Sequence, residues 1–198
     1  MPRGEKRREE IAAVAERVFL ERGFADTTMQ VIAARAGASK ETLYRHFGSK
    51  EGLFSEVVRN RSARVTSGLE GELSSIGAPS KILSDLGLTL LRFLLSADSL
   101  SLYRVVVAEA PRAAELGPIF YAQAPGRLLD QLARYLGLAT QRGELRCPEP
   151  DRAAKLFVGA VVSTYQMLGL IAEASFGEAE LQAHVEEAVN LFIARYGF

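Results

Sequence analysis

Residues 28–50 read TMQVIAARAGASKETLYRHFGSK, and this stretch predicts two short helices joined by a glycine turn. Apolar residues recur in the first helix at i, i+3, i+4 and i+7, the stripe of an amphipathic helix: Met29, Ile32, Ala33 and Ala36. Thr28 stands at the N-cap position, and Gly37 follows as a residue that adopts a left-handed C-terminal conformation at little cost.

The second helix of this stretch is expected to begin after Ser39, which is a good N-cap residue. Leu43 and Phe47 lie one turn apart and form its inward face. The opposite face presents polar and aromatic side chains: Glu41, Thr42, Tyr44 and Arg45. A short helix with a small apolar foot and a polar outer face suits entry into the major groove of DNA. The stretch therefore predicts a helix-turn-helix that binds double-stranded DNA.

The segment that ends at Phe54 resembles the DNA-binding domain of the TetR family of bacterial repressors. Nearly every position of that pattern is filled: GF at 23–24, TT at 27–28, IA at 32–33, AG at 36–37, S at 39, TLY at 42–44, HF at 46–47 and SKE at 49–51. Residues 102–121, LYRVVVAEAPRAAELGPIFY, are similar to a regulatory-domain subgroup of that family, the AefR-like one. The resemblance implies a two-fold dimer that regulates transcription.

Composition places the chain among ordinary globular proteins, with 198 residues, 48% of them hydrophobic and 24% charged. The single cysteine, Cys147, cannot form an intramolecular disulfide, so a reducing cytoplasm fits best. No apolar segment follows the basic start MPRGEKRREE, so no signal peptide is expected. Residues 157–172 are uncharged but shorter than the roughly 20 residues of a membrane helix, and polar side chains interrupt them. A buried core helix, with no membrane partner, is the better interpretation.

Charge is distributed unevenly along a chain whose net charge is zero. Residues 1–66 hold 13 Lys+Arg against 9 Asp+Glu, a net of +4, and residues 67–198 hold 11 against 15, a net of −4. The excess is modest, and solvated helix faces can produce such an asymmetry. Its location on the helix-turn-helix half nevertheless favours nucleic acid as a partner.

Helical periodicity runs through nearly the whole chain, so the predicted fold is all-α. We expect an N-terminal three-helix head with the helix-turn-helix in residues 1–50, a connector helix to about residue 73, and a larger C-terminal helical bundle in 74–198. The boundary is placed at the loop SSIGAPS, residues 74–80. This bundle is expected to bind a ligand and to dimerise, and two long helices, about 151–175 and 178–196, end it.

DNA contacts are expected from seven residues. Four are candidate phosphate ligands: Thr28, Tyr44, His46 and Lys50. Three are candidate base readers: Lys40, Thr42 and Arg45. Alternatively, Tyr44 and His46 only pack the small domain. Glu41 can accept from cytosine N4, or it can pair with Arg45 one turn later, and the pair is favoured.

The last two helices carry apolar stripes that predict self-association. The candidate interface residues are Phe157, Val161, Leu168, Val185, Val189 and Phe192. Helix 151–175 is apolar almost all round and must be covered on several sides. Packing inside one subunit can also satisfy these stripes. The two-fold homodimer is what the family resemblance implies.

A binding site for a small, mostly apolar effector is inferred from polar residues within apolar stretches of the C-terminal part. The candidates are Tyr103, Arg104, Tyr121, Gln123, Tyr165 and Gln166. Each tyrosine can instead be an ordinary packed side chain whose hydroxyl is satisfied.

Ligand-responsive regulation of transcription, with repression favoured, is therefore the predicted function, exerted on a near-palindromic operator. The alternative is a constitutive helix-turn-helix DNA-binding or nucleoid factor with no effector. An enzyme is not expected, because the two histidines are His46 and His184 and no glycine-rich phosphate loop, metal-spaced cluster or serine elbow appears. Accordingly no cofactor and no metal are predicted.

Overall fold

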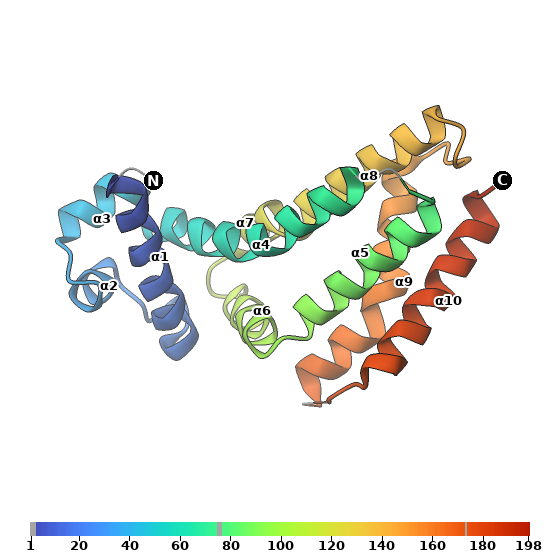
Figure 1. Ribbon diagram of the computed structural model, residues 1–198. Coiled ribbons are helices and arrows are strands. Elements are labelled where there is room, and N and C mark those ends of the chain that lie inside the picture. Colours follow the sequence, from blue (N-terminus) through green and yellow to red (C-terminus); the bar gives the residue numbers. More distant parts are fainter. Residues whose placement is uncertain (1–2, 75–76, 173) are drawn as a thin grey trace. The chain divides into compact units, whose positions relative to one another are not determined.

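The structure is a computed structural model that describes residues 3–74, 77–172 and 174–198 (Figure 1). These residues form ten helices and no strand, which confirms the predicted all-α class. The helices are α1 (Arg3–Arg22), α2 (Met29–Arg35), α3 (Lys40–Phe47), α4 (Lys50–Ser74), α5 (Pro79–Leu94), α6 (Ala97–Glu109), α7 (Leu116–Gln123), α8 (Pro125–Gln141), α9 (Pro150–Ile171) and α10 (Glu178–Tyr196).

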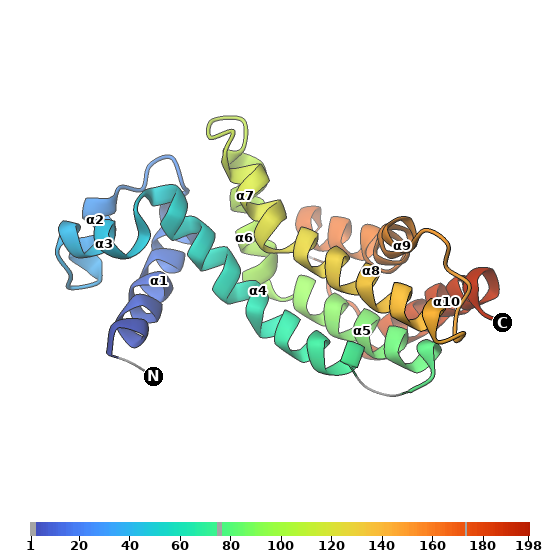
Figure 2. The ribbon, with the colours of Figure 1, turned by 90° about the horizontal axis from the view of Figure 1, so that it is seen from above.

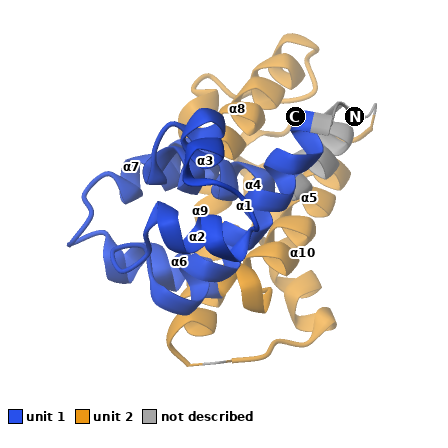
Figure 3. Cartoon of the chain, turned by 90° about the vertical axis from the view of Figure 1, so that its left-hand side faces the viewer, with its two compact units in different colours: residues 1–63, 101–125 blue, residues 64–100, 126–198 orange. Residues whose placement is uncertain are grey.

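Two compact units make up the chain, and neither is one continuous stretch of sequence (Figure 3). Unit 1 contains residues 1–63 and 101–125, and unit 2 contains residues 64–100 and 126–198. The units do not follow the division at residue 74 that the sequence suggests, because residues 101–125, from the C-terminal part, pack with the N-terminal head. Helix α4 runs from one unit into the other.

Unit 1 is built around a buried cluster from α1 to α4. Phe19, Phe24 and Phe54 form its centre, with ring centroids 5.4–5.5 Å apart in one stacked and two edge-to-face pairs. All three rings are at most 2% exposed. Aromatic pairs in these geometries add to the free energy gained by burial. The three phenylalanines therefore join the end of α1, the turn after it and the start of α4.

Helices α6 and α7 belong to the same cluster. Leu102 and Val106 on α6 and Leu116 at the start of α7 are buried among the side chains of the head. The hydroxyl of Ser62 on α4 also donates to the backbone carbonyl of Gln123, at 2.7 Å. Two helices from the C-terminal part of the sequence are thus built into the core of the N-terminal head.

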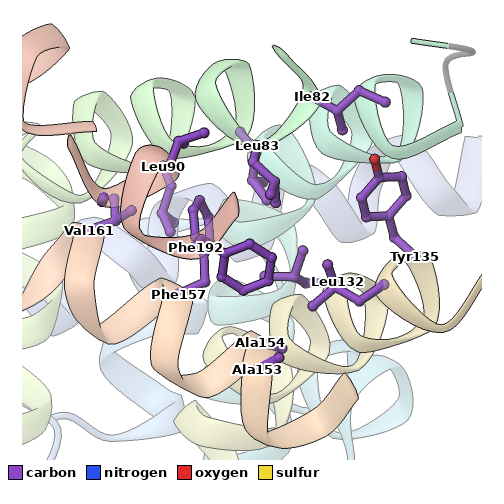
Figure 4. Close-up of a cluster of buried hydrophobic side chains, with 14 of the residues drawn as sticks. Ile82, Leu83, Leu90, Leu132, Tyr135, Ala153, Ala154, Phe157, Val161 and Phe192 are labelled. Carbon is purple, nitrogen blue, oxygen red and sulfur yellow. The ribbon is translucent and has the colours of Figure 1, made fainter. Parts of the chain in front are cut away.

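Unit 2 is a helical bundle of α5, α8, α9 and α10 with one continuous core (Figure 2). In that core Phe157 of α9 and Phe192 of α10 meet edge to face, with centroids 5.4 Å apart (Figure 4). Helix α5 packs closely on α10 at Gly87, where an added Cβ would lie only 2.8 Å from Cγ1 of Val185. The absence of a side chain at Gly87 thus lets the two backbones approach.

Helix α9 is long and apolar enough to cross a membrane by length and composition, and among the described residues it alone passes that test. Core helices of globular proteins pass it too. One face of α9, which includes Ala153, Phe157 and Val161, is buried in the unit 2 core. Only 28% of its most apolar 18-residue window is buried, and three large apolar residues of α9 are exposed within the described chain: Leu156, Met167 and Ile171.

Candidate nucleic-acid interface

Helix α2 forms as its sequence predicts. The hydroxyl of Thr28 accepts from the backbone N–H of Val31 at 3.3 Å, which confirms Thr28 as the N-cap. The inward stripe is buried at Met29, Ile32 and Ala33. Gly37 then takes a φ of +57°, a conformation that side-chain-bearing residues rarely adopt, and so allows the tight turn into the next helix.

Helix α3 has the small buried apolar face and the exposed polar face that are expected of a recognition helix. Ser39 caps it by accepting from the N–H of Thr42 at 3.0 Å. Leu43 and Phe47 are buried. The outer face exposes four side chains to solvent: Lys40, Glu41, Tyr44 and Arg45. This face is therefore free to approach a DNA groove.

A close contact between backbones fixes α3 against α4. A Cβ built on Gly52, in the first turn of α4, would lie 2.1 Å from the carbonyl oxygen of Phe47, the last residue of α3. No side chain fits at that distance, so the tight approach requires glycine. The recognition helix is thereby held at its C-terminal end by the helix that follows it.

The candidate contact residues on and before α3 differ in exposure. Thr28 is exposed, whereas Thr42 and His46 are half-buried. The hydroxyl of Thr42 lies 2.8 Å from that of Ser39, within hydrogen-bond distance. Lys40 Nζ lies 5.8 Å from the centroid of the Tyr44 ring, so the two side chains are neighbours on the outer face.

The favoured pairing of Glu41 with Arg45 is not seen in the part of the chain that the structure describes. Both side chains are exposed, and no ion pair joins them. In water such an i, i+4 pair contributes only about 0.2–0.5 kcal/mol, which is little to set against the entropy of two long side chains. Both groups are consequently available to a partner.

Lys50 lies at the first position of α4, but its ammonium group points into the protein. Its Nζ donates to the backbone carbonyls of Phe24 at 2.8 Å, Thr27 at 2.9 Å and Ala25 at 3.4 Å. It also lies 4.2 Å from the centroid of the Phe24 ring, a cation–π distance. The residue predicted as a phosphate ligand is thus occupied by the turn between α1 and α2.

Two charged residues hold the helix-turn-helix through contacts that its own sequence does not indicate. Arg7 of α1 donates from Nη2 to the carbonyls of Ala36 at 2.8 Å and Gly37 at 2.9 Å, at the turn after α2. Glu109, at the end of α6, accepts from the N–H of Ala25 at 2.5 Å. These contacts span 29 to 84 positions in sequence, so no local pattern could have revealed them.

An ion-pair group links α1 to α4 beside this region. Glu56, only 6% exposed, accepts from Arg8 at 2.6 Å and also from Arg59. Burial opposes the charged form of Glu56, but the hydrogen bonds from Arg59 and Arg8 outweigh it and hold the pKa of the carboxyl below its usual value. The carboxylate therefore stays ionised and binds two of the head's basic side chains.

The six candidate effector residues are divided between the two units. Tyr103, Arg104, Tyr121 and Gln123 belong to unit 1, whereas Tyr165 and Gln166 belong to unit 2. The Tyr103 ring packs edge to face on Phe120, with centroids 5.6 Å apart. The Tyr165 ring packs on Phe176 and His184, and its hydroxyl donates to Glu180 at 3.3 Å. Both tyrosines thus make ordinary packing contacts, which is the alternative to a role in effector binding.

Another tyrosine, Tyr135 of α8, was not singled out from the sequence. Its side chain is 3% exposed, and its hydroxyl has no hydrogen-bond partner in the described chain. Burial, and to a smaller degree the carboxylate of Glu144, raise the pKa of Tyr135 to about 12. The hydroxyl is therefore a protonated, unused donor inside unit 2, near Ile82 and Leu132 (Figure 4).

Most of the predicted dimer contacts lie in the interior of unit 2. Phe157, Val161, Val185, Val189 and Phe192 are all at most 6% exposed and belong to its core. A buried side chain cannot form the surface that meets a second subunit. Their apolar stripes are satisfied by α5, α9 and α10 packing on one another within the subunit, the alternative noted from sequence. Leu168 is half-buried.

Known proteins show which family has this arrangement. Residues 11–57 match the family described as bacterial regulatory proteins of the tetR family, and residues 81–198 match the C-terminal domain of AefR-like transcriptional repressors. The chain belongs to the TetR family. The second match covers residues 101–125 as well, so two helices of the TetR regulatory domain are packed into the head of this protein.

Individual relatives agree with this assignment. The solved structure of a TetR-family transcriptional regulator from Mesorhizobium loti superposes with a TM-score of 0.86 and 31% identity over 100% of both chains. The flavonoid-responsive regulator FrrA gives 0.81 and 25% over 98% of both. The A-factor receptor protein of Streptomyces griseus is 28% identical over 89% of this chain. The chain spans 59% of that receptor's length, and less than two-thirds of the other curated relatives it matches first.

The TetR-family relatives are regulators of transcription. In the described part of the chain, no group of three or more His, Cys, Asp or Glu residues is placed to hold a metal ion.

Proposed function

We propose that this TetR-family protein is a repressor that binds a near-palindromic operator in the cytoplasm as a homodimer and is released by a small, mostly apolar effector. The observation that carries the proposal is the outer face of α3, which exposes Lys40, Tyr44 and Arg45 while Leu43 and Phe47 anchor the helix. A constitutive DNA-binding factor remains the alternative, and the response to an effector distinguishes the two.

Base reading is assigned to Lys40, Thr42 and Arg45 on α3. Lysine and arginine suit the O6/N7 edge of guanine, and threonine can contact a thymine methyl. Thr28, Tyr44 and His46 are assigned to phosphates, because they flank this face with hydroxyl and imidazole groups. Lys50 is not assigned to a phosphate, since its ammonium group is directed inward.

Arg45→Ala is expected to weaken operator binding by about 1–3 kcal/mol and to relax the preference at one base position in each half-site. The reason is that the exposed Arg45 guanidinium can reach a base edge, and alanine cannot make that contact. Binding to a set of operator variants, changed one base at a time, measures both effects.

Arg134→Ala is the matched control, because Arg134 is an exposed arginine of α8, in the other unit. It removes the same charge and should leave the base preference unchanged. If Arg45→Ala lowers the affinity for every sequence equally, Arg45 contacts the backbone, and Lys40 becomes the first candidate for base reading.

The dimer surface is proposed on the exposed side of α9, opposite the core residues. Apolar and small side chains line that side at intervals of three and four residues: Leu156, Gly159, Ala160, Ser163, Met167 and Ile171. Leu156, Met167 and Ile171 are 58%, 53% and 74% exposed, which is unusual for large apolar residues on one helix face. The small residues in the middle would allow close approach of a second copy.

Helix α10 extends the same surface. The imidazole Nε2 of His184 lies 3.1 Å from the carbonyl oxygen of Ala160, which places this side of α10 next to α9. Leu191 follows His184 by seven residues, or two helical turns, and is 63% exposed. A second copy that covered α9 would therefore also cover Leu191.

An effector is supported by the names of two relatives, a flavonoid-responsive regulator and an A-factor receptor. Within this chain, the unused hydroxyl of Tyr135 offers a donor to one polar group of an otherwise apolar molecule. An unsatisfied buried hydroxyl is costly, so a ligand that accepts from it gains affinity. By linkage, an effector that weakens DNA binding must itself be bound less tightly by the DNA complex, by the same factor.

Tyr135→Phe is expected to weaken the response to the effector while leaving the fold as stable as before, or more so, because it removes only the unpaired oxygen. A thermal-shift screen with flavonoids and other small aromatic molecules provides the ligand. At a hundred times its dissociation constant it should stabilise the wild type by about 2.7 kcal/mol and release DNA. If Tyr135→Phe binds the ligand with an unchanged dissociation constant, Tyr135 is not part of the effector site. If the screen finds no stabilising ligand, the constitutive DNA-binding factor is favoured.

A further inference from the structure

The ammonium group of Lys50 uses its full hydrogen-bonding capacity inside the head. A lysine has three N–H donors, and Nζ of Lys50 lies within hydrogen-bond distance of three carbonyl oxygens, those of Phe24, Ala25 and Thr27. The residue caps the turn that leads into α2. A contact to a DNA phosphate would require at least one of these bonds to break.

The same turn is also held from its other side. The Glu109 carboxylate of α6 accepts from the N–H of Ala25, whose carbonyl is one of the Lys50 acceptors. The carboxylate also lies 3.2 Å from the position of a Cβ on Gly23, so it fills the space beside that glycine. The turn before α2 is thus bound through both its N–H and C=O groups.

Arg7 makes the corresponding contact at the other end of α2. Its Nη2 donates to the carbonyls of Ala36 and Gly37, and its Nη1 to Glu10 at 3.1 Å. The last carbonyls of a helix have no partners within the helix and carry its partial negative charge, so a cation stabilises them. Gly37 belongs to the turn that sets where α3 begins.

We propose that Lys50 and Arg7 are positioning residues for DNA binding, which fix the turns on either side of α2 and thereby the presentation of α3, without contacting phosphate themselves. The inference rests on the proposed function, in which α3 reads the operator. A groove-reading helix must be held to within about 0.5 Å of its productive geometry by such supporting contacts. Both cations act through the backbone of the helix-turn-helix.

The test compares Lys50→Met and Arg7→Met with the wild type in the full-length protein. Methionine keeps much of the length of each side chain and removes its charge. Arg134→Ala is the control for loss of one positive charge outside the head. For each protein, operator and random-sequence DNA are titrated over a range of salt concentrations, well below the unfolding temperature of every variant.

Both variants are expected to bind the operator roughly tenfold more weakly, which is about the discrimination that one base contact provides. Their affinity for random-sequence DNA should change little. The slope of log affinity against log salt should stay at its wild-type value, because no phosphate contact is removed. Lys50→Arg should not restore operator affinity, since a planar guanidinium cannot direct three donors at the converging carbonyls.

Two results overturn the proposal. If the salt slope falls by about 0.9 and both kinds of DNA are bound more weakly, the residue is a phosphate ligand, and Lys50→Arg should then restore binding. If the unfolding temperature falls while both affinities and their ratio stay at wild-type values, the contacts only stabilise the fold. A wild type that binds no operator at all refutes the proposed function instead, and is recognised before any variant is measured.

Discussion

Met167→Asp is expected to convert the proposed dimer into a folded monomer and to weaken operator binding by roughly 10²–10⁴-fold, because a monomer engages one half-site without the gain from the second. Met167 is 53% exposed within the apolar side of α9, so the folded subunit tolerates a carboxylate there. In the dimer, the two-fold axis would bring two such carboxylates into an apolar interface, where unpaired charges are strongly unfavourable.

Light scattering at micromolar concentration measures the molar mass, and operator titration measures the affinity. Leu138→Asp is the matched control, because Leu138 is an apolar residue of α8 that is 47% exposed and lies outside the proposed surface. The control should stay dimeric. A Met167→Asp protein that remains a dimer with wild-type affinity would show that α9 does not form the interface.

Phe192→Asp is expected to unfold unit 2, lowering the free energy of unfolding by about 3–5 kcal/mol, because it buries an unpaired charge and removes a core aromatic ring. Phe192 is 6% exposed and packs on Phe157 and Tyr196, with centroids 5.4 Å and 4.7 Å away. Chemical denaturation followed by circular dichroism measures the loss.

Leu191→Asp changes the adjacent position on α10 and distinguishes loss of core packing from loss of dimer formation. Leu191 is 63% exposed, so this variant should stay folded and lose only dimer affinity. A Phe192→Asp protein that is as stable as the wild type but monomeric would return Phe192 to the interface, as the sequence stripe suggested. The pair of neighbouring variants therefore tests the revised interface directly.

Local signals in the sequence were sufficient to predict the two helices of the helix-turn-helix and the turn between them. The caps at Thr28 and Ser39 and the buried positions Ile32, Leu43 and Phe47 all depend on residues within one or two turns, and each is confirmed. Helix propensity, capping and amphipathic spacing act over those same distances. For that reason the caps and the buried sides of α2 and α3 could be predicted residue by residue, whereas the pairing of Glu41 with Arg45 could not.

Contacts between distant segments could not be read in this way. A stripe such as Val185 and Phe192 shows that one face of a helix is covered, but not whether the cover comes from the same chain or another. The basic side chain of Lys50 looks the same in sequence whether it binds phosphate or backbone carbonyls. Likewise, nothing near Glu109 indicates that its partner is the N–H of Ala25, 84 positions earlier.

Sequencing the DNA that the purified protein retains from a random pool is the sharpest test of whether α3 reads an operator. We expect one enriched near-palindrome whose half-site centres lie one helical turn, about 34–36 Å, or a multiple of it apart. The same selection with Arg45→Ala should relax one position in each half-site. Retention of no preferred sequence, or of a single unrepeated half-site by a monomeric protein, would contradict the proposed binding of a dimer to an operator.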